Sequence, residues 1–518
     1  MTASGSGTSL SDLSDDLLRH VLFFAPAFDG AATAALARRW RTLWRSSGAV
    51  NLHWRCDGGD DGWKERMDFL RRAESALAAA HAEGTVRRLT FHVVADSDHQ
   101  TQSFLSRRGD LNVIDSVLSN PAARRVEELS VKVHIYGYTN GINKFGGIYE
   151  LGNGTLPSEA LRVLHITNCS NLGLCSPGAA FPWLSSVRLQ GCTVLLGRLQ
   201  SMIDTARQLA TLHLEWSFLA GSMEVSERTQ DYWSLATCVG VECYQLRCPA
   251  VTELVLANCK WPGKVQGGME LDVPRLRYFR YTGYIGLVSL KSHAANLARA
   301  DLHFIDEFHR EEYKMGNKMC ESFWQFLQNF NDAKVLKVKL SYPIEQIAVA
   351  EMNDLDELLG CKLLWNLERL EVEAWHMPRP LGKDTAVAIA NLLHCCPVIH
   401  DLRLMLTTTT SRIPVIPFDE EDDDSTYKVS EISELRKYSF NCLQNCLRRV
   451  RLQFQLEYVN CFQVQLAKFL AENALVLEEM YIEDRNYKVR EYINRRVRRW
   501  ISDASKRRNS SSVAAFAL

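Results

Sequence analysis

The sequence carries no excess of either charge sign. Its 60 lysines and arginines face 61 aspartates and glutamates, which leaves a formal charge of -1. No field of the whole chain therefore draws it toward nucleic acid or acidic lipid. The chain also lacks an apolar run long enough to span a bilayer, and residues 1–11 lack the basic start and apolar stretch of a secretory signal. We expect a soluble protein of the cytoplasm, the nucleus or both, with no membrane partner.

Paired cysteines and catalytic motifs are missing as well. The 15 cysteines are odd in number and irregularly spaced, so we expect reduced, intracellular thiols. Cys238, Cys243 and Cys248 lie too far apart for the close ligand pairs of a zinc site. The sequence holds no Gly-x-Ser-x-Gly elbow, no Walker loop, no Gly-x-Gly-x-x-Gly and no His-Glu-x-x-His. It therefore predicts a non-catalytic protein without a metal ion or cofactor.

Apolar residues, in contrast, are plentiful. They make up 46% of the 518 positions, against 23% for charged residues, so a sizeable core can be buried. Length alone allows about three domains of about 150 residues or one long repeat architecture. The segments that we expect are a flexible N-terminus (1–11), a helical domain (12–50), a connecting helix (51–84), irregular repeats (85–440), further C-terminal repeats (441–484), and a basic helix and tail (485–518).

Residues 12–50 have the pattern of a small helical domain. An acidic first turn precedes apolar residues at helical spacing, which predicts an amphipathic helix ending before Pro26. A second helix is expected over residues 29–45, with leucines and tryptophans on one side and arginines between them. Because so small a domain buries little apolar surface by itself, it should dock onto another structure.

From residue 85 onward the period of the apolar residues changes. Short units carry apolar side chains at i, i+3 and i+5, and several units end in Cys or Asn. This alternation is typical of half-buried strands, and the intervals between units leave room for a returning helix or loop. The units begin at Val86, Val126, Leu161, Leu184, Leu209, Val251, Leu276, Leu367 and Ile399. The predicted fold class is α/β: a small helical domain followed by an irregular leucine-rich repeat solenoid with a parallel sheet and outer helices and loops.

Other segments fit between or break these repeats. Helices are expected over residues 63–81, 198–207, 322–330 and 385–393. Three stretches, 136–157, 223–248 and 413–430, interrupt the pattern and are expected to form long loops or insertions. The third contains an unbroken acidic run, 419–424, which we interpret as a solvated loop in preference to a site for a metal or a basic partner.

The C-terminal part has a pattern of its own. Residues 447–452 predict a strand, residues 463–472 a helix, and residues 473–482 a helix end followed by a strand. After Asp484 arginine and lysine dominate. A solvated cationic helix is favoured there over a nuclear-import or nucleic-acid segment. Its packed side would consist of Val489, Ile493, Val497 and Trp500 or Ile501.

Residues 13–18, 21–24 and 36–45 together resemble the plant F-box, the module that binds the Skp-type linker of cullin-based ubiquitin ligases. The closing tryptophans, Trp40 and Trp44, are its most specific part. Ser14 and Ala37 stand where the family usually has Pro and Ser. Residues 469–474 and 477–480 resemble the FBD module that follows the repeats of many plant F-box proteins.

This F-box, repeat and FBD order implies a substrate-recognition adaptor of an SCF (Skp-cullin-F-box) ubiquitin ligase. The F-box would bind the Skp-type linker and, through it, cullin, while the repeats would bind a protein substrate that the sequence does not identify. The resemblance implies ten linker-binding residues: Leu13, Leu17, Leu18, Val21, Leu22, Phe24, Leu36, Trp40, Leu43 and Trp44. Spacing alone does not divide them between the linker interface and the core of the domain.

Two other functions stay open. The departures at Ser14 and Ala37 allow a leucine-rich repeat interaction scaffold whose F-box has decayed and which has no ligase role. The basic C-terminal segment allows a nucleic-acid binder, whose affinity would fall steeply with salt.

Overall fold

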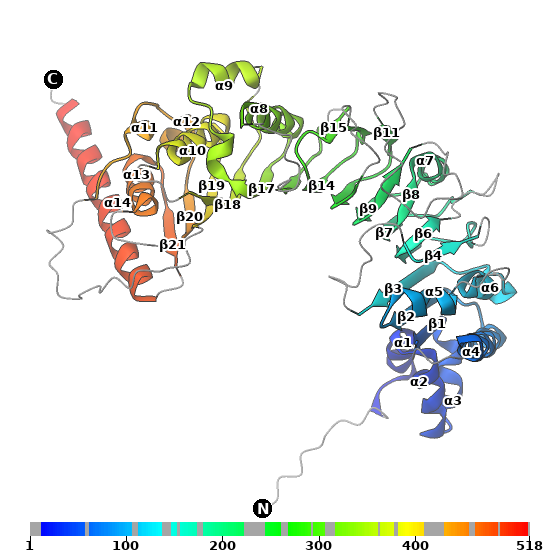
Figure 1. Cartoon of the computed structure of the whole chain (residues 1–518). Coiled ribbons are helices and arrows are strands. Elements are labelled where there is room, and N and C mark those ends of the chain that lie inside the picture. The colour runs from blue at the N-terminus through cyan, green and yellow to red at the C-terminus, as the bar shows by residue number, and fades with distance from the viewer. Residues whose placement is uncertain are drawn as a thin grey trace, which may run out of the picture. The chain divides into compact units, whose positions relative to one another are not determined.

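A computed structural model describes residues 12–56, 62–105, 112–136, 147–152, 156–172, 180–221, 244–260, 268–291, 294–305, 316–360, 363–377, 382–408, 429–454, 461–484 and 487–515. The acidic run 419–424 and most of the three expected loops lie outside these residues. The chain divides into two compact units, residues 1–267 and 268–518. Each unit is described by itself, with the element labels of Figure 1.

Unit 1 begins with a helical region of short elements. They are α1 (Asp15–Phe24), α2 (Ala27–Ala32), η2 (Thr33–Ala35), α3 (Trp40–Leu43) and η3 (Arg45–Ser47). The expected first helix is confirmed, but the prediction of one continuous helix over residues 29–45 is wrong. The amide of Leu36 bonds the carbonyl of Thr33 three residues back, and the Thr33 hydroxyl bonds Gly30, so tight 3₁₀ turns replace the second helix.

The strands of unit 1 form one parallel sheet in the order β1-β2-β3-β5-β7-β9-β12. They are β1 (Ala49–Arg55), β2 (Arg88–Ala95), β3 (Glu128–Ile135), β5 (Val163–Thr167), β7 (Ser186–Gln190), β9 (Thr211–Glu215) and β12 (Glu253–Ala257). Smaller strands beside it are β4 (Tyr149–Leu151), β6 (Cys169–Leu172), β8 (Thr193–Leu195), β10 (Phe218–Ala220) and β11 (Tyr244–Arg247). The helices are α4 (Gly62–Glu83), α5 (Asp98–Leu105), α6 (Val113–Leu118), η4 (Pro121–Ala123) and α7 (Leu196–Thr205).

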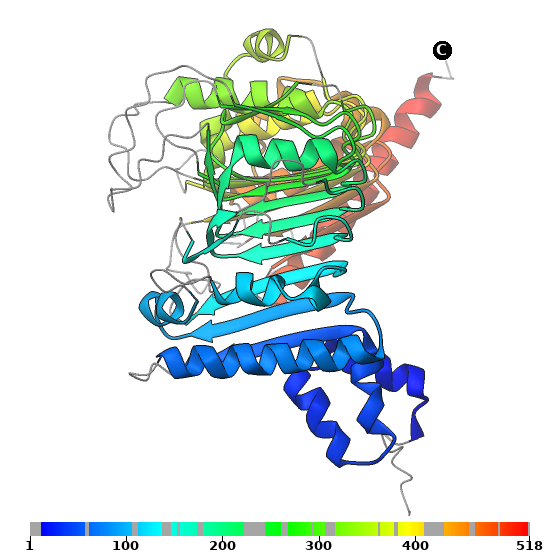
Figure 2. The same cartoon turned by 90° about the vertical axis from the view of Figure 1, so that its right-hand side faces the viewer.

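The alternation of apolar residues produces this sheet. In β2, Leu89, Phe91 and Val93 are buried, while the residues between them reach toward solvent. All six units predicted in this part of the sequence coincide with strands, so the solenoid pattern is confirmed here. Figure 2 shows the helical region at the end of the unit 1 sheet, where α1 and α2 contact β1.

A left-handed residue followed by a small buried one ends four strands of unit 1. The pairs are Asn168–Cys169, Gly191–Cys192, Trp216–Ser217 and Asn258–Cys259. The Cys192 thiol donates to the carbonyl of Ile166 at 3.6 Å, and the Cys259 thiol donates to that of Leu214 at 3.2 Å. The Cys and Asn residues that end several predicted units therefore lie at the turns where the chain leaves the sheet.

Two of the expected loops contain structure where the chain is described. Tyr149 and Leu151 are buried in β4, which pairs with β6. Leu246 is buried in β11. At these residues the stretches 136–157 and 223–248 are therefore insertions with short strands beside the main sheet, and not loops, because their apolar side chains are buried.

Unit 2 holds a second run of parallel strands, in the order β14-β16-β17-β18-β19-β20-β21. They are β14 (Tyr278–Gly283), β16 (Arg299–Phe304), β17 (Val335–Pro343), β18 (Arg369–His376), β19 (Asp401–Thr408), β20 (Arg449–Phe454) and β21 (Glu479–Glu483), with β13 (Met269–Asp272) and β15 (Val288–Leu290) paired beside them. The helices are α8 (Gly316–Leu327), η6 (Gln328–Phe330), η7 (Ile344–Ile347), α9 (Met352–Leu358), α10 (Lys383–Cys395), α11 (Ser433–Arg436), α12 (Asn441–Asn445), α13 (Phe462–Asn473) and α14 (Tyr487–Ala515). Helices α8 and α10 lie on one side of this sheet, and among the described residues no helix covers the other side, which we call the open face (Figure 1).

The last helix covers the free edge of β21. Ile493 and Val497 of α14 are buried, as predicted, and α14 contacts both α13 and β21. Arg496 is also buried, between the rings of Tyr492 and Trp500, so the expectation that the cationic residues are all solvated is wrong at this position. Within the described residues, no helix is both long and apolar enough to cross a membrane.

Candidate protein-interaction site

The helical region has a small apolar core of its own. Leu18 and Leu22 of α1 pack with Trp40 and Leu43 of α3, and all four are buried. Leu13 and Trp44 are partly buried against this core. Four of the ten residues implied by the resemblance therefore hold the region together, because burial leaves no surface for a partner.

The other apolar residues of the set are exposed. The exposed fractions are 53% for Leu17, 50% for Val21, 56% for Phe24 and 72% for Leu36. Leu17, Val21 and Phe24 are spaced by four and three residues, so they lie on one face of α1. We call these three residues the α1 stripe. Exposed apolar side chains gathered in this way mark interaction surfaces in soluble proteins.

One further exposed aromatic residue of the helical region is not among the ten that the resemblance implies. Phe28 is 70% exposed at the start of α2, four residues after Phe24 in the sequence. The guanidinium of Arg72 lies 5.7 Å from its ring centroid, and that of Arg88 lies 5.0 Å from the ring of Phe24. Phe28 could have been found from the sequence only as an apolar residue outside the predicted helices.

Polar contacts fix the N-terminal end of α1. The backbone amide of Leu17 donates to the hydroxyl of Ser14 at 3.4 Å, so Ser14 caps the helix at a position where the F-box family usually has Pro. Arg39 bonds the carboxylate of Asp15 at 2.5 Å and the carbonyl of Leu13 at 2.6 Å. These contacts tie the first helix to the segment before α3.

A buried amide fixes the other end of α1. Asn51 of β1 donates to the carbonyls of Phe23 at 2.9 Å and Ala25 at 2.8 Å. Its own oxygen accepts a hydrogen bond from the Thr90 hydroxyl on β2 at 2.8 Å. The α1 stripe is therefore attached to the first two strands of the repeat sheet. This attachment agrees with the expectation that the small helical domain docks onto another structure.

The thiols and acids of the described residues do not gather into a metal site. No group of three or more His, Cys, Asp or Glu side chains within this part of the chain is placed to hold a metal ion. Burial raises the pKa of the Cys192 and Cys259 thiols to about 12, so both stay protonated and act as hydrogen-bond donors.

The fold and the α1 stripe define a class of protein. It is an α/β leucine-rich repeat protein that carries an N-terminal helical region with an exposed apolar helix face.

Comparison with known sequences finds relatives that match parts of this chain. No family model matches the chain. An F-box/LRR-repeat protein of Arabidopsis thaliana is 24% identical over 205 residues, which cover 39% of this chain and 57% of the relative. Two shorter matches of 49% identity are to an FBD-associated F-box protein, over 47 residues, and to an F-box protein, over 43 residues, both of Arabidopsis thaliana.

These matches cover 9% and 8% of this chain and 25% and 10% of the two relatives. The chain thus spans little more than half of the first relative and a quarter or less of the others. The predicted resemblance to plant F-box proteins with leucine-rich repeats and an FBD module is confirmed.

Proposed function

We propose that this protein is a non-catalytic, substrate-recognition adaptor of an SCF ubiquitin ligase. The helical region would bind a Skp-type linker and, through it, cullin, while the repeats would hold a protein substrate. Such an adaptor accelerates modification by raising the local concentration of substrate near the transfer machinery, and needs no catalytic side chain of its own. The relatives named as F-box proteins support the coarse role.

One observation carries the proposal: the ten implied residues separate into four buried core residues, two partly buried ones and four exposed ones. We assign linker binding to Leu17, Val21 and Phe24, together with the exposed Leu36. Leu18, Leu22, Trp40 and Leu43 would act by maintaining the helical region, and Leu13 and Trp44 by closing its rim. Large apolar side chains that become buried in the centre of an interface contribute most of its binding energy.

The alternative is a repeat scaffold with a decayed F-box. Of the two departures that motivate it, Ser14 caps α1 in place of the family's proline, which supports an intact helix. Ala37 is exposed in the turn before α3. The two functions differ in a single property, which is affinity for the linker.

Co-purification of the full chain with a plant Skp-type linker tests the proposal. The decisive variant carries Leu17→Asp and Val21→Asp, which place charge on the stripe without opening the core. Leu475→Asp is the matched control, because Leu475 is similarly exposed but belongs to unit 2. We expect the native chain and the control to retain the linker and the stripe variant to lose it while its circular dichroism stays native. A folded native chain that fails to retain the linker would support the scaffold instead.

A further inference from the structure

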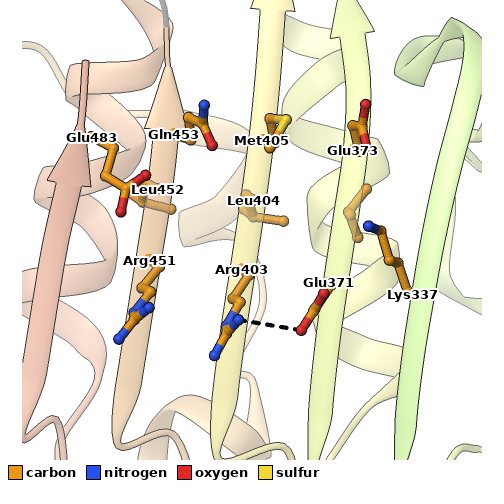
Figure 3. A pocket seen from close by; sticks show the side chains of 11 residues that line it. Lys337, Glu371, Glu373, Arg403, Leu404, Met405, Arg451, Leu452, Gln453 and Glu483 are labelled. Carbon is orange, nitrogen blue, oxygen red and sulfur yellow. Dashed lines mark ion pairs between the residues drawn. The ribbon is translucent and has the colours of Figure 1, made fainter. Parts of the chain in front are cut away.

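The open face of the unit 2 sheet carries a cluster of arginines on three adjacent strands. Its members are Arg369 on β18, Arg403 on β19, and Arg449 and Arg451 on β20. In the parallel register Arg369, Asp401 and Arg449 lie opposite one another, and so do Glu371, Arg403 and Arg451. Figure 3 looks onto this face, with helices behind the strands and Arg403 and Arg451 extending side by side. We call the four side chains the arginine cluster.

Two carboxylates compensate part of this charge. The side chain of Asp401, only 5% exposed, lies 3.0 Å from Arg369, 3.5 Å from Arg403 and 3.9 Å from Arg449. Glu371 lies 3.4 Å from Arg403. Three of the four guanidinium groups therefore share two carboxylates.

Arg451 is the residue of the arginine cluster whose positive charge is not balanced by a carboxylate of the described residues. Its side chain is exposed, and no acidic group of the described residues lies within ion-pair distance of it. It stands directly opposite Arg403 on the neighbouring strand, about 4.8 Å away along the hydrogen-bonding direction. Like charges in directly opposed positions repel each other, so a carboxylate placed between the two guanidinium groups would relieve that repulsion.

The surface next to Arg403 and Arg451 carries acidic and uncharged side chains. A hollow of about 200 Å³ continues along the strands past Met405 and Gln453 to Glu373 and Glu483. Glu373 is already paired with Lys339. Figure 3 shows the two arginines at one end of the hollow and the two glutamates at the other, with Met405 and Gln453 level with the glutamates. The end of the hollow with the two glutamates would accept an apolar or uncharged polar side chain of a bound segment on Met405. It would repel a second acidic side chain of that segment.

The strand spacing sets the pattern that this surface can recognise. Arg403 and Met405 are two residues apart on β19, about 6.6 Å along the strand. An extended peptide has the same distance between side chains i and i+2, and both point to one face. A peptide running along β19 can therefore place one residue at Arg403 and Arg451 and the next but one at Met405.

We propose that this surface binds an extended protein segment of the pattern acidic-x-apolar. The acidic carboxylate would accept hydrogen bonds from Arg403 and Arg451, and the apolar side chain would pack on Met405. The proposal rests on the adaptor role above in one respect, which is that the bound segment would then belong to a substrate. Binding of the segment itself does not require that role. Its test therefore measures linker binding separately, in the same protein preparation.

Fluorescence anisotropy with labelled glycine–serine peptides, titrated with the full chain, measures this binding. The probe contains one aspartate-serine-leucine sequence. Comparison peptides replace aspartate by lysine, leucine by aspartate, or aspartate by phosphoserine. We expect the aspartate-serine-leucine peptide to bind best and its affinity to fall as salt rises. Equal binding of the lysine peptide would overturn the proposal, as would a tenfold preference for phosphoserine, since that outcome assigns the surface to phosphate.

Three variants locate the binding. Arg451→Glu should weaken binding about tenfold or more, whereas Glu371→Gln, which releases Arg403, should strengthen it several-fold. Lys437→Glu is the control, because it makes the same charge change at an exposed position after α11. The gain in Glu371→Gln cannot arise from misfolding. Unchanged affinity in both Arg451→Glu and Glu371→Gln would contradict the proposal, and intact linker binding in those proteins would separate that failure from failure of the adaptor role.

Discussion

The side-chain amide of Asn51, on the first strand of the repeat sheet, donates a hydrogen bond of 2.8 Å to the carbonyl of Ala25, the residue that ends α1. This bond joins the helical region to the repeats at one buried point. It means that the orientation of the α1 stripe depends on a residue outside the F-box-like sequence.

Replacing this amide should loosen α1. Asn51→Ala leaves the carbonyls of Phe23 and Ala25 without their donor, at a cost of about 1–3 kcal/mol for such a buried group. Hydrogen exchange measured by mass spectrometry should show faster exchange of the α1 amides. Asn445→Ala, at an exposed position on α12, is the control and should leave α1 unchanged. Native protection of α1 in Asn51→Ala would show that the contact is dispensable.

A second buried amide closes the far edge of the unit 2 sheet. Asn494 of α14 donates to the carbonyl of Ile482 at 2.8 Å and accepts from its amide at 3.0 Å, as a neighbouring strand would. Asn494→Leu removes both bonds and should lower the free energy of unfolding by about 1–3 kcal/mol. It should also promote association through the open edge of β21. Urea unfolding and light scattering measure the two effects, and a monomeric variant of native stability would refute this role.

One histidine should make unit 1 sensitive to acid. Burial, reinforced by Lys132, Arg188 and His213, lowers the pKa of His165 from 6.5 to about 4. Above pH 6.5 this residue is neutral in both the folded and the unfolded chain. Between pH 6.5 and 4 only the unfolded chain takes up the proton, so stability falls as pH decreases through this range.

The effect is measured by comparing unfolding midpoints at pH 7 and pH 5. His165→Leu should show a smaller loss of stability on acidification than the native chain. His81→Gln, which alters an exposed histidine on α4, should behave like the native chain. Equal acid sensitivity in His165→Leu and the native chain would contradict the assignment.

The thiols that follow the strands should resist alkylation. Burial raises the pKa of Cys192 and Cys259 to about 12, and the thiolate is the reactive form. Brief treatment of the native protein with iodoacetamide at pH 8, followed by peptide mass spectrometry, should leave both unmodified. Among the cysteines that the structure describes, the partly exposed Cys446 should be labelled first. Early labelling of Cys192 or Cys259 would show that these strand ends open to solvent.

Much of the fold could be predicted because its signal is local. Each predicted unit, such as Leu370 with Val372, places its apolar residues on the buried side of a strand. The strands β16 and β17 were missed, although Ala300 and Ala333 stand in the same pattern, because alanine is a weak apolar signal. The break of the second helix depends on local turn bonds at Thr33, which periodicity does not reveal.

The candidate site was predictable only in outline. The sequence selects the apolar residues of α1, but Leu17 and Leu18 are adjacent and chemically identical, and only packing against Trp40 distinguishes the buried one from the exposed one. The arginine cluster was invisible for another reason. Arg403 and Arg451 are far apart in sequence and meet only through the register of β19 and β20.

Calorimetric titration of a plant Skp-type linker into the full chain tests the role of the α1 stripe most directly. The variants are Leu17→Ala, Val21→Ala and Phe24→Ala, with Leu475→Ala as the matched control on unit 2. We expect the native chain and the control to bind, and the stripe variants to lose about tenfold or more in affinity at unchanged stability, as interface anchors do. Native affinity in all three stripe variants would contradict the assignment of linker binding to the α1 stripe, and no binding by the folded native chain would contradict the adaptor role.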